Sequence, residues 1–139
     1  MILHASAVSM EGRGLLVLGK SGAGKSGLAL RLMALGARLV SDDRVILEAR
    51  ADGVLMATAP GQIAGLIEAR GVGLLQVDPV SSARIVLAVD LDTRPEARLP
   101  QDRCITIMGC ELELISGRDV PNMDAILAIL LQEGRKVAT

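Results

Sequence analysis

Eight consecutive residues, Gly19-Lys20-Ser21-Gly22-Ala23-Gly24-Lys25-Ser26, decide the fold of this chain. They match the pattern G-x-x-x-x-G-K-[ST], in which glycines let successive backbone N–H groups turn inward and surround phosphate oxygens. In such loops the lysine, here Lys25, reaches the β and γ phosphates, and the next hydroxyl, here that of Ser26, is a magnesium ligand. The stretch predicts a site for a nucleoside triphosphate with Mg²⁺, and it leaves open an ATPase, a GTPase or a kinase.

The segments on either side of this loop supply the context that the pattern requires. Leu15–Leu18 is a continuous apolar run, typical of a strand that is buried on both faces. Residues 2–9 are predicted to form a strand that pairs with it through a turn at 11–14. Beyond the loop, leucines at helical spacing predict a helix over Ser26–Leu35 with Gly36 as its C-cap. This order argues against a mere glycine-rich turn.

The rest of the chain predicts more strands than a doubly wound nucleotide fold contains. Residues 92–103 are polar and contain two prolines, which indicates a loop, and a closing helix is predicted over Met123–Gln132 with Ile126, Leu127, Leu130 and Leu131 on its apolar side. The strand candidates are Arg38–Val40, Val45–Ala49, Val54–Thr58, Leu66–Arg70, Leu74–Val77, Ile85–Val89, Ile105–Met108 and Leu112–Ile115. We predict a single α/β domain over residues 1–139, with a hairpin-rich mixed sheet and a helix after the phosphate loop.

Composition excludes several classes of protein. The chain is 50% hydrophobic without any Phe, Trp or Tyr, so its core is aliphatic and it has no aromatic platform for stacking bases. The net charge of −1, without a basic stripe, also argues against nucleic-acid binding. Cys104 and Cys110 match no common zinc spacing and are predicted to be reduced, partly buried thiols. Because we find no signal peptide and no apolar stretch of about 18 residues, we expect a cytoplasmic protein without a membrane segment.

Acidic residues after the phosphate loop are candidates for proton transfer. Asp42 and Asp43 follow the strand candidate Arg38–Val40, and a strand beside the phosphate-loop strand would bring its carboxyl end close to the phosphates. Glu68 and Arg70 alternate within an apolar stretch, so that one strand face would carry both side chains, at a site or in solvent. The single histidine, His4, is by itself more often structural than catalytic.

Three stretches of the chain resemble the catalytic domain of HPr kinase/phosphorylase, the bacterial enzyme that phosphorylates a serine of the phosphocarrier HPr. They are Leu3-His4-Ala5, the run from Gly19 through Leu39-Val40-Ser41-Asp42-Asp43-Arg44-Val45, and Glu68-Ala69-Arg70-Gly71-Val72-Gly73-Leu74-Leu75-Gln76-Val77. The third is far more specific than the phosphate loop. Their order and spacing fit this family from residue 1 to about residue 90.

The resemblance implies roles for individual residues. Asp43 would accept the proton of the substrate serine, and His4 would support the site near the phosphates. Lys25 would be both a phosphate ligand and a catalytic residue, within a loop, Gly19–Ser26, that binds ATP. Ser26 and Glu68 would bind Mg²⁺. Arg98, in Ala97-Arg98-Leu99-Pro100, would match the active-site arginine of the family. The family also implies a homo-oligomer, specifically a hexamer.

Three features differ from the full-length enzymes of this family. The chain shows no counterpart of their additional N-terminal domain, as in a short form seen in some proteobacteria, and Gly27 stands where an acidic residue is frequent. The loop associated with dephosphorylation is typically rich in Pro, Arg and Gly, and Ile107-Met108-Gly109-Cys110 does not resemble it. We therefore expect an ATP-dependent protein serine kinase that acts on HPr or a related phosphocarrier in phosphotransferase-system regulation, with weak or lost dephosphorylation. The alternative is a nucleotide-binding regulatory module of that system with little phosphoryl transfer.

Overall fold

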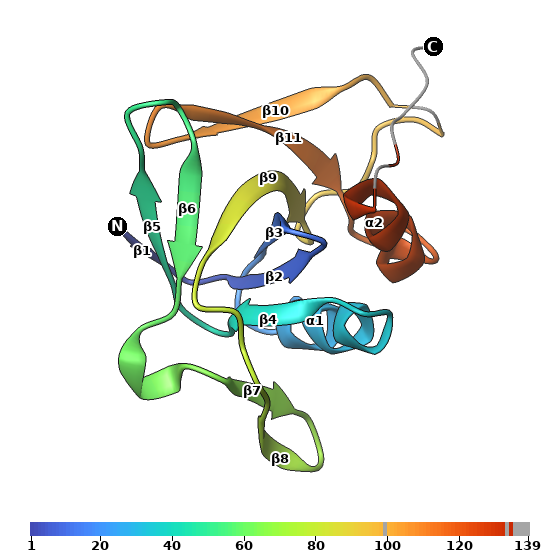
Figure 1. Cartoon of the computed structure of the whole chain (residues 1–139). Helices are drawn as coiled ribbons and strands as arrows, with labels where there is room; N and C mark the ends of the chain where they lie inside the picture. The colour runs from blue at the N-terminus through green and yellow to red at the C-terminus, as the bar shows by residue number, and fades with distance from the viewer. Residues whose placement is uncertain (99, 133, 135–139) are drawn as a thin grey trace.

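A mixed β-sheet with two helices on one face forms the body of the molecule (Figure 1). The computed structural model describes residues 1–98, 100–132 and 134. The strands of the main sheet are β1 (Ile2–Leu3), β2 (Ser6–Met10), β3 (Arg13–Leu18), β4 (Arg38–Ser41), β5 (Val45–Ala49), β6 (Leu55–Thr58), β9 (Ala83–Asp90), β10 (Arg103–Ile107) and β11 (Cys110–Ser116). The strands β7 (Leu66–Ala69) and β8 (Gly73–Gln76) form a separate hairpin. The helices are α1 (Lys25–Ala34) and α2 (Met123–Leu131), and Gly61–Ile63 form a 3-10 turn.

The main sheet has the order β1-β5-β6-β9-β3-β2-β4, and the β10–β11 hairpin joins it where β11 pairs with β9. Strands β3, β9 and β11 run parallel, with Leu18 and Ser116 both paired with Asp90. Their carboxyl ends therefore meet at one end of the sheet, which is where ligands bind in sheets of this kind. The phosphate loop leaves from this end, directly after β3.

Alternating side chains of the central strands feed two apolar clusters, one on each face of the sheet. Leu15 and Val17 pack with Leu28 and Leu32 of α1 and Leu127 of α2. Leu16, between them in sequence, packs on the opposite face with residues of β5, β6, β10 and β11. A strand flanked by apolar layers on both faces is what the continuous run Leu15–Leu18 predicts.

The β10–β11 hairpin closes with a two-residue turn at the far end of the sheet. Met108 and Gly109 have φ values of 51° and 78°, the two positive values that a type I′ turn requires. Strand β11 begins at Cys110, beside this turn, and ends at Ser116, opposite Asp90. Ile107-Met108-Gly109-Cys110 therefore lies at the end of the sheet opposite to the phosphate loop.

The predicted α/β class, the mixed hairpin-rich sheet and the helix after the loop are confirmed. The single strand over residues 2–9 is wrong, because the chain changes partners there: β1 pairs with β5, whereas β2 pairs with β3 and β4. The predicted strand Leu66–Arg70 ends at Ala69, since Arg70 enters the turn of the β7–β8 hairpin.

Two side-chain predictions are also wrong in part. Ile126 is 38% exposed, because α2 buries Met123 and Ala128 beside Leu127 and Leu131 instead. The two cysteines are both free thiols, but neither is partly buried: Cys104 is exposed and Cys110 is buried. The predicted domain extends over 1–139, of which residues 99, 133 and 135–139 lie outside the described residues. Among the helices described, none is long and apolar enough to cross a membrane.

Candidate active site at the phosphate loop

The phosphate loop connects β3 to α1 and depends on glycine at both ends. Gly24, the N-cap of α1, has φ 100° and is left-handed, a conformation that residues with a Cβ atom adopt at a cost. A Cβ atom on Gly19 would lie 2.9 Å from the Cβ atom of Ala23 and 3.3 Å from that of Leu91. The loop thus closes tightly at its start and turns into the helix at its end.

Lys25 lies across this loop. Its Nζ atom donates hydrogen bonds to the carbonyl oxygens of Gly19, at 2.6 Å, and of Lys20, at 3.0 Å. The ammonium group is therefore already positioned over the loop, together with the N-terminal end of α1, which carries partial positive charge. This arrangement fits the binding of phosphate groups.

A second contact fixes the start of the loop to the neighbouring parallel strand. The backbone N–H of Lys20 donates to Oδ2 of Asp92 at 2.9 Å, and the N–H of Asp92 donates to Oδ1 of Asp90 at 2.9 Å. The N–H of Leu91 also donates to the carbonyl of Leu18, at 2.9 Å. The carboxyl end of β9 consequently braces the entrance of the phosphate loop.

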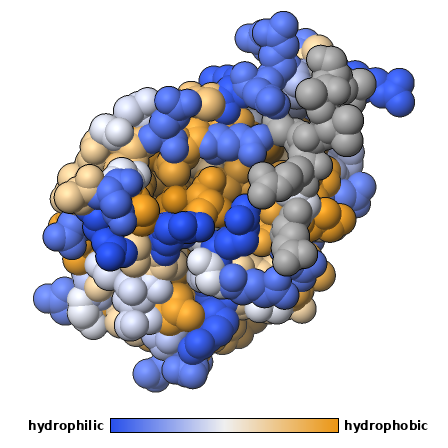
Figure 2. Space-filling model, turned by 45° about the horizontal axis from the view of Figure 1, so that its top comes forward, coloured by the Kyte–Doolittle hydropathy of each residue, from blue (hydrophilic) through white to orange (hydrophobic). Residues whose placement is uncertain are grey.

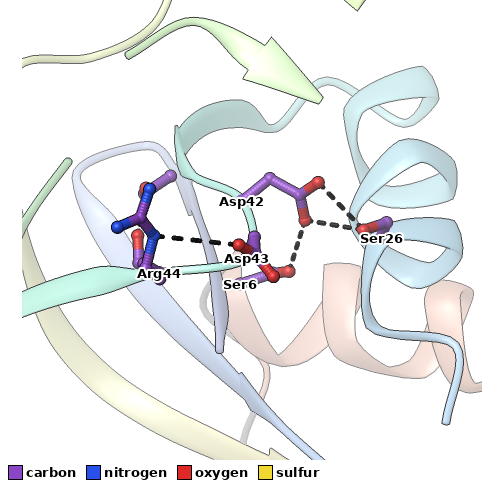
Figure 3. Close-up of polar contacts among 6 residues, drawn as sticks. Ser6, Ser26, Asp42, Asp43 and Arg44 are labelled. Atoms are coloured by element: carbon purple, nitrogen blue, oxygen red, sulfur yellow. Dashed lines mark hydrogen bonds and ion pairs between the residues drawn. The ribbon is translucent and has the colours of Figure 1, made fainter. Parts of the chain in front are cut away.

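Asp42 is the centre of a buried polar cluster beside the loop (Figure 3). The residue is 5% exposed. The hydroxyl of Ser26 donates to both of its oxygens, at 2.7 Å and 2.9 Å. The hydroxyl of Ser6 donates to Oδ1 at 2.6 Å, and the backbone N–H of Glu68 donates to Oδ2 at 3.2 Å. We call Ser6, Ser26, Asp42 and the backbone of Glu68 the Asp42 cluster; it joins β2, α1 and β7.

The position of Asp42 follows from the register of β4, and it corrects one expectation. Strand β4 is not beside β3, because β2 lies between them. The pairing of Ser9 with Arg38 and of Val8 with Leu39 shifts by one residue to pair Ala7 with Ser41. Continued antiparallel pairing then places Asp42 opposite Ser6, whereas the unshifted register would place Ser41 there. The irregularity in β4 thus aligns the buried carboxylate with Ser6, and the same carboxylate accepts a hydrogen bond from Ser26 in α1.

Asp43 differs from Asp42 in its backbone conformation and in its exposure. It has φ 74°, in the left-handed region that few non-glycine residues occupy. Its side chain is 73% exposed, and its Oδ2 atom lies 3.8 Å from the Nε atom of Arg44. Figure 3 shows Arg44 approaching Asp43 on the side away from Ser26. An exposed carboxylate on a strained turn next to a phosphate loop is open to a second substrate, and such strain is frequent at active sites.

His4 and Glu68 are brought to the same place by backbone contacts. The N–H of Ala5 donates to the carbonyl oxygen of Asp43 at 3.2 Å, so His4 adjoins Asp43. Glu68 adjoins Asp42 through its own N–H, and the side chains of Glu68 and His4 are both exposed. The structure therefore gathers five of the predicted site residues around the Asp42 cluster: His4, Lys25, Ser26, Asp43 and Glu68.

Arg98 is placed with a different part of the molecule. It lines a cavity of about 1040 Å³ between the segment that follows β9, the strand β11 and the helix α2. None of the described residues that line this cavity belongs to the phosphate loop. On the face seen in Figure 2, hydrophobic surface is bordered by hydrophilic residues. The expectation that Arg98 belongs to the site stays a prediction, and its neighbour Leu99 lies outside the described residues.

Sequence reasoning assigned no separate role to Asp42 and missed Ser6 and Asp92. Asp42 was one of an adjacent acidic pair, and nothing local in the sequence says which of two neighbouring aspartates is buried. Ser6 lies in an otherwise apolar strand, where a small polar residue gives little signal. Asp92 follows a strand that ends beside the phosphate loop, so its place at the carboxyl end of β9 was the available signal.

The residues at this site suit a Mg²⁺ ion that is bound by few protein ligands. Within the described residues, no group of three or more His, Cys, Asp or Glu side chains is arranged to hold a metal ion. Magnesium is commonly bound through one or two carboxylates, substrate phosphates and water, without an all-protein cage. The hydroxyl of Ser26 donates its hydrogen to Asp42, and the backbone N–H of Glu68 contacts the same carboxylate, so a serine oxygen and one further carboxylate suit that kind of site.

Comparison with known proteins gives concordant results from sequence and from structure. Residues 1–91 match the sequence model of the HPr Serine kinase C-terminal domain. The chain is 37% identical over 139 residues to the HPr kinase/phosphorylase of Caldanaerobacter subterraneus, in an alignment that covers 98% of this chain and 45% of that protein. It is 33% identical over 147 residues to the enzyme of the same name from Caldicellulosiruptor bescii, in an alignment that covers 96% of this chain and 47% of that protein. The chain thus spans about half the length of these curated relatives.

A solved structure shares the fold. The Hpr(Ser) kinase/phosphatase from Coxiella burnetii superposes with a TM-score of 0.80 at 23% identity, over 96% of this chain and 95% of that chain. The match extends past residue 91, so the arrangement of β10, β11 and α2 also has a counterpart in a known fold.

Proposed function

Because the chain belongs to the HPr serine kinase C-terminal domain family, we propose that it transfers the γ-phosphoryl group of ATP to a serine of HPr or a related phosphocarrier. A single observation carries the proposal. At the start of the helix that follows the phosphate loop, the Ser26 hydroxyl is held by a buried aspartate, and an exposed aspartate follows in the next position. The Ser26 end of this arrangement suits a metal–nucleotide complex, and the Asp43 end suits the hydroxyl group that accepts the phosphoryl group.

The donor half consists of the residues from Gly19 to Ser26. The backbone amides of the loop and the start of α1 would surround the β and γ phosphates, and Lys25 would exchange its contacts with Gly19 and Lys20 for phosphate oxygens. Ser26 and Glu68 would hold Mg²⁺, which when bound neutralises charge on the phosphates. Since the hydrogen of Ser26 is donated to Asp42, a lone pair of its oxygen remains available to the metal.

The acceptor half centres on Asp43. The serine hydroxyl of the phosphocarrier would give its proton to this carboxylate while its oxygen forms a bond to the γ phosphorus. The bond between that phosphorus and the β–γ bridging oxygen breaks, and ADP leaves. His4, which adjoins Asp43 through the Ala5–Asp43 contact, would support the transferring phosphoryl group.

The proposal is tested by mixing the purified chain with HPr, Mg²⁺ and ATP labelled at the γ position. We expect label on a serine of HPr, and no label when Mg²⁺ is chelated. Binding of both ATP and HPr without transfer would instead support the regulatory module. A chain that binds neither would overturn both.

Substitution of Asp43 separates chemistry from nucleotide binding. Asp43→Asn keeps the length of the side chain and a residue type that tolerates left-handed backbone, but it removes the carboxylate. We expect transfer to fall by roughly 10² to 10⁴-fold, the usual contribution of a general base. Nucleotide affinity should not change. Asp43→Gly, which also accommodates the φ value, is the control for backbone effects, and its loss of transfer should match that of Asp43→Asn.

The segment that the sequence analysis considered for the reverse reaction lies away from the phosphate loop. The Ile107–Cys110 turn lies far from the phosphate loop, whereas Gly117–Asn122 leaves β11 at the phosphate-loop end and contains Gly, Arg and Pro. The expectation of weak dephosphorylation, which came from the composition of this turn, stays a prediction. Incubation of phosphorylated HPr with inorganic phosphate measures the reaction directly. Rapid release of pyrophosphate would contradict the expected weakness of this activity.

We further propose that the chain acts as a homo-oligomer, with the hexamer of its family as the expected form. Exposed apolar side chains on β1 and the β7–β8 hairpin, including Ile2 at 61% and Leu74 at 70%, are consistent with surfaces that are covered by other copies. Sedimentation equilibrium of the purified chain measures the mass of the assembly and therefore the number of copies in it.

A further inference from the structure

We propose that Ser6 is a positioning residue that sets the magnesium affinity of the phosphate loop through Asp42. The inference rests on the proposed function in that it concerns the same metal–nucleotide site. Its observation is independent, however: a fully buried hydroxyl in β2 donates a 2.6 Å hydrogen bond to the carboxylate that holds Ser26. Neither the phosphate-loop pattern nor the predicted site residues include Ser6.

The geometry shows why Asp42 needs a second anchor. Asp42 directly follows β4 and precedes the strained turn at Asp43, and its carboxylate contacts both β2 and α1. Ser26 alone would leave the carboxylate able to rotate about its side-chain torsions. Ser6 on Oδ1 and the N–H of Glu68 on Oδ2 hold one oxygen each, so both oxygens face Ser26 at hydrogen-bonding distance.

The consequence concerns the hydrogen of Ser26. A serine oxygen that binds Mg²⁺ must direct its hydrogen away from the metal, and among the residues that the structure describes its acceptor is Asp42. A fixed carboxylate therefore keeps the lone pair of Ser26 free. If Ser6 loses its hydroxyl, Oδ1 loses a donor inside the protein, and the carboxylate can turn toward another arrangement. Partners of this kind, behind a metal ligand, typically change metal affinity by about 10- to 100-fold.

The same carboxylate links the hairpin that carries Glu68 to the phosphate loop. The contact from the N–H of Glu68 to Asp42 is the longest of the cluster, at 3.2 Å, and β7 belongs to a sheet separate from β2 and β4. A displaced Asp42 would therefore shift both proposed metal ligands, Ser26 directly and Glu68 through its backbone. Ser6 contacts neither phosphate nor metal in this arrangement, so its effect passes through Asp42.

The test measures metal binding without any phosphocarrier. Mn²⁺ is titrated into the full chain with a non-hydrolysable ATP analogue, and free Mn²⁺ is followed by electron paramagnetic resonance. For Ser6→Ala we expect about a tenfold weaker Mn²⁺ affinity. Affinity for a fluorescent ADP analogue in the presence of EDTA should stay within twofold of the wild type, because the loop amides and Lys25 do not depend on Ser6. A merely structural role would lower both affinities together.

Three further variants keep the inference falsifiable. Ser6→Thr and Ser6→Val add the same volume at this buried position, but only threonine retains the hydroxyl, so valine should bind Mn²⁺ more weakly than threonine. Ser9→Ala is the matched control, since Ser9 lies in the same strand, is 8% exposed and pairs with Gly14 and Arg38, away from Asp42. Unchanged Mn²⁺ affinity in Ser6→Ala, or equal affinity in the threonine and valine variants, would overturn the assignment.

These outcomes are distinguishable from failure of the proposed kinase function. If the wild-type chain binds Mn²⁺ with nucleotide but transfers nothing to HPr, the kinase proposal fails, and the comparison of Ser6 variants still decides the role of Ser6. If transfer occurs and Ser6→Ala keeps the wild-type dependence on Mg²⁺ concentration, the role of Ser6 fails and the kinase proposal stands.

Discussion

Asp42 follows the carboxyl end of β4, and the segment of residues 92–103 follows the carboxyl end of β9. Buried hydrogen bonds hold the Asp42 cluster, whereas the contacts of the segment described below are exposed. In the cluster, the carboxylate of a residue that is 5% exposed accepts three donors from three elements. The segment is polar, contains two prolines, and has an ion pair between Arg94 and Asp119, at 2.7 Å, whose side chains are 65% and 62% exposed. Buried hydrogen bonds with no water to replace them define one geometry, whereas an exposed ion pair contributes at most about 1 kcal/mol.

This difference decides how far each region can be assigned a role. The cluster ties Ser26 to Asp42 and Asp42 to the backbone of Glu68, so a role for one residue constrains the others. Within the segment, Arg98 lines a cavity that no described residue of the phosphate loop lines, and the role of Arg98 depends on the resemblance alone. Three substitutions test this contrast.

Removal of the Asp42 carboxylate should have the largest effect. Asp42→Ala leaves the hydroxyls of Ser6 and Ser26 and the N–H of Glu68 without their acceptor. Because unsatisfied buried polar groups cost about 1–3 kcal/mol each, and some will find new partners, we expect the free energy of unfolding to fall by roughly 3 kcal/mol. Transfer to HPr should fall by about 100-fold or more, since both proposed metal ligands lose their support and each such loss typically costs about 10- to 100-fold. Chemical denaturation and the labelled-ATP assay measure the two effects.

Asp52→Ala is the control for removal of an aspartate. Asp52 lies in the exposed turn between β5 and β6, where its carboxylate accepts a hydrogen bond from the N–H of Val54. Stability should fall by less than about 1 kcal/mol, and transfer should be unchanged. An Asp42→Ala variant as stable and active as Asp52→Ala would show that the buried cluster does not organise the site.

Substitution of Arg98 should affect transfer without affecting stability. Among the described residues, no hydrogen bond or ion pair holds its guanidinium, so Arg98→Ala should leave the unfolding transition in place. If Arg98 contacts the transferring phosphoryl group, as the resemblance implies, transfer should fall by about 10²-fold. The matched variant Arg94→Ala removes the ion pair with Asp119 and should cost up to about 1 kcal/mol of stability while transfer is retained. Unchanged transfer in Arg98→Ala would remove Arg98 from the active-site role that the resemblance implies.

The sequence predicted the parts of the fold that depend on local patterns. The loop at Gly19–Ser26, the apolar run of β3, the leucine spacing of α1 and the β5–β6 hairpin each follow from residues close together in the chain. The order of strands does not. Nothing near Arg38–Ser41 indicates that β2 would separate β4 from β3, because strand order is set by pairing between distant segments.

The candidate site shows the same division. Residues that a motif specifies, such as Lys25 and Ser26, were predicted from the sequence. Asp43, Glu68 and His4 were candidates from their place in the chain, and the resemblance assigned them roles. Asp42 and Ser6 acquire their roles from a one-residue shift in the pairing of β2 and β4. Such a shift turns a side chain from one face of a sheet to the other without leaving a recognisable pattern in the sequence.

The smallest expected effect concerns Cys104, which lies where the segment of residues 92–103 ends and the ladder of β10 and β11 begins. A hydrogen bond with the Glu111 carboxylate, with smaller contributions from burial and from the charges of Glu111, Glu113 and Asp102, raises the pKa of the Cys104 thiol above its ordinary value. The thiolate is the reactive form, so less of it is present at a given pH than for an unperturbed cysteine. Alkylation by iodoacetamide at pH 8 should therefore be slow, and Glu111→Gln should accelerate it a few-fold by lowering the pKa.

Glu113→Gln is the matched control, because Glu113 is paired with Cys104 in the ladder but acts on its pKa only through charge. Its acceleration should be smaller than that of Glu111→Gln. Cys110 is buried and should react more slowly than Cys104 in each variant, which peptide mass spectrometry resolves. Equal alkylation rates in the wild type and Glu111→Gln would mean that the ladder does not fix the geometry around Cys104 at its Arg103 end. The loosely held segment of residues 92–103 would then extend beyond residue 103 into β10. The difference between this segment and the buried Asp42 cluster would be larger than the start of β10 at Arg103 indicates.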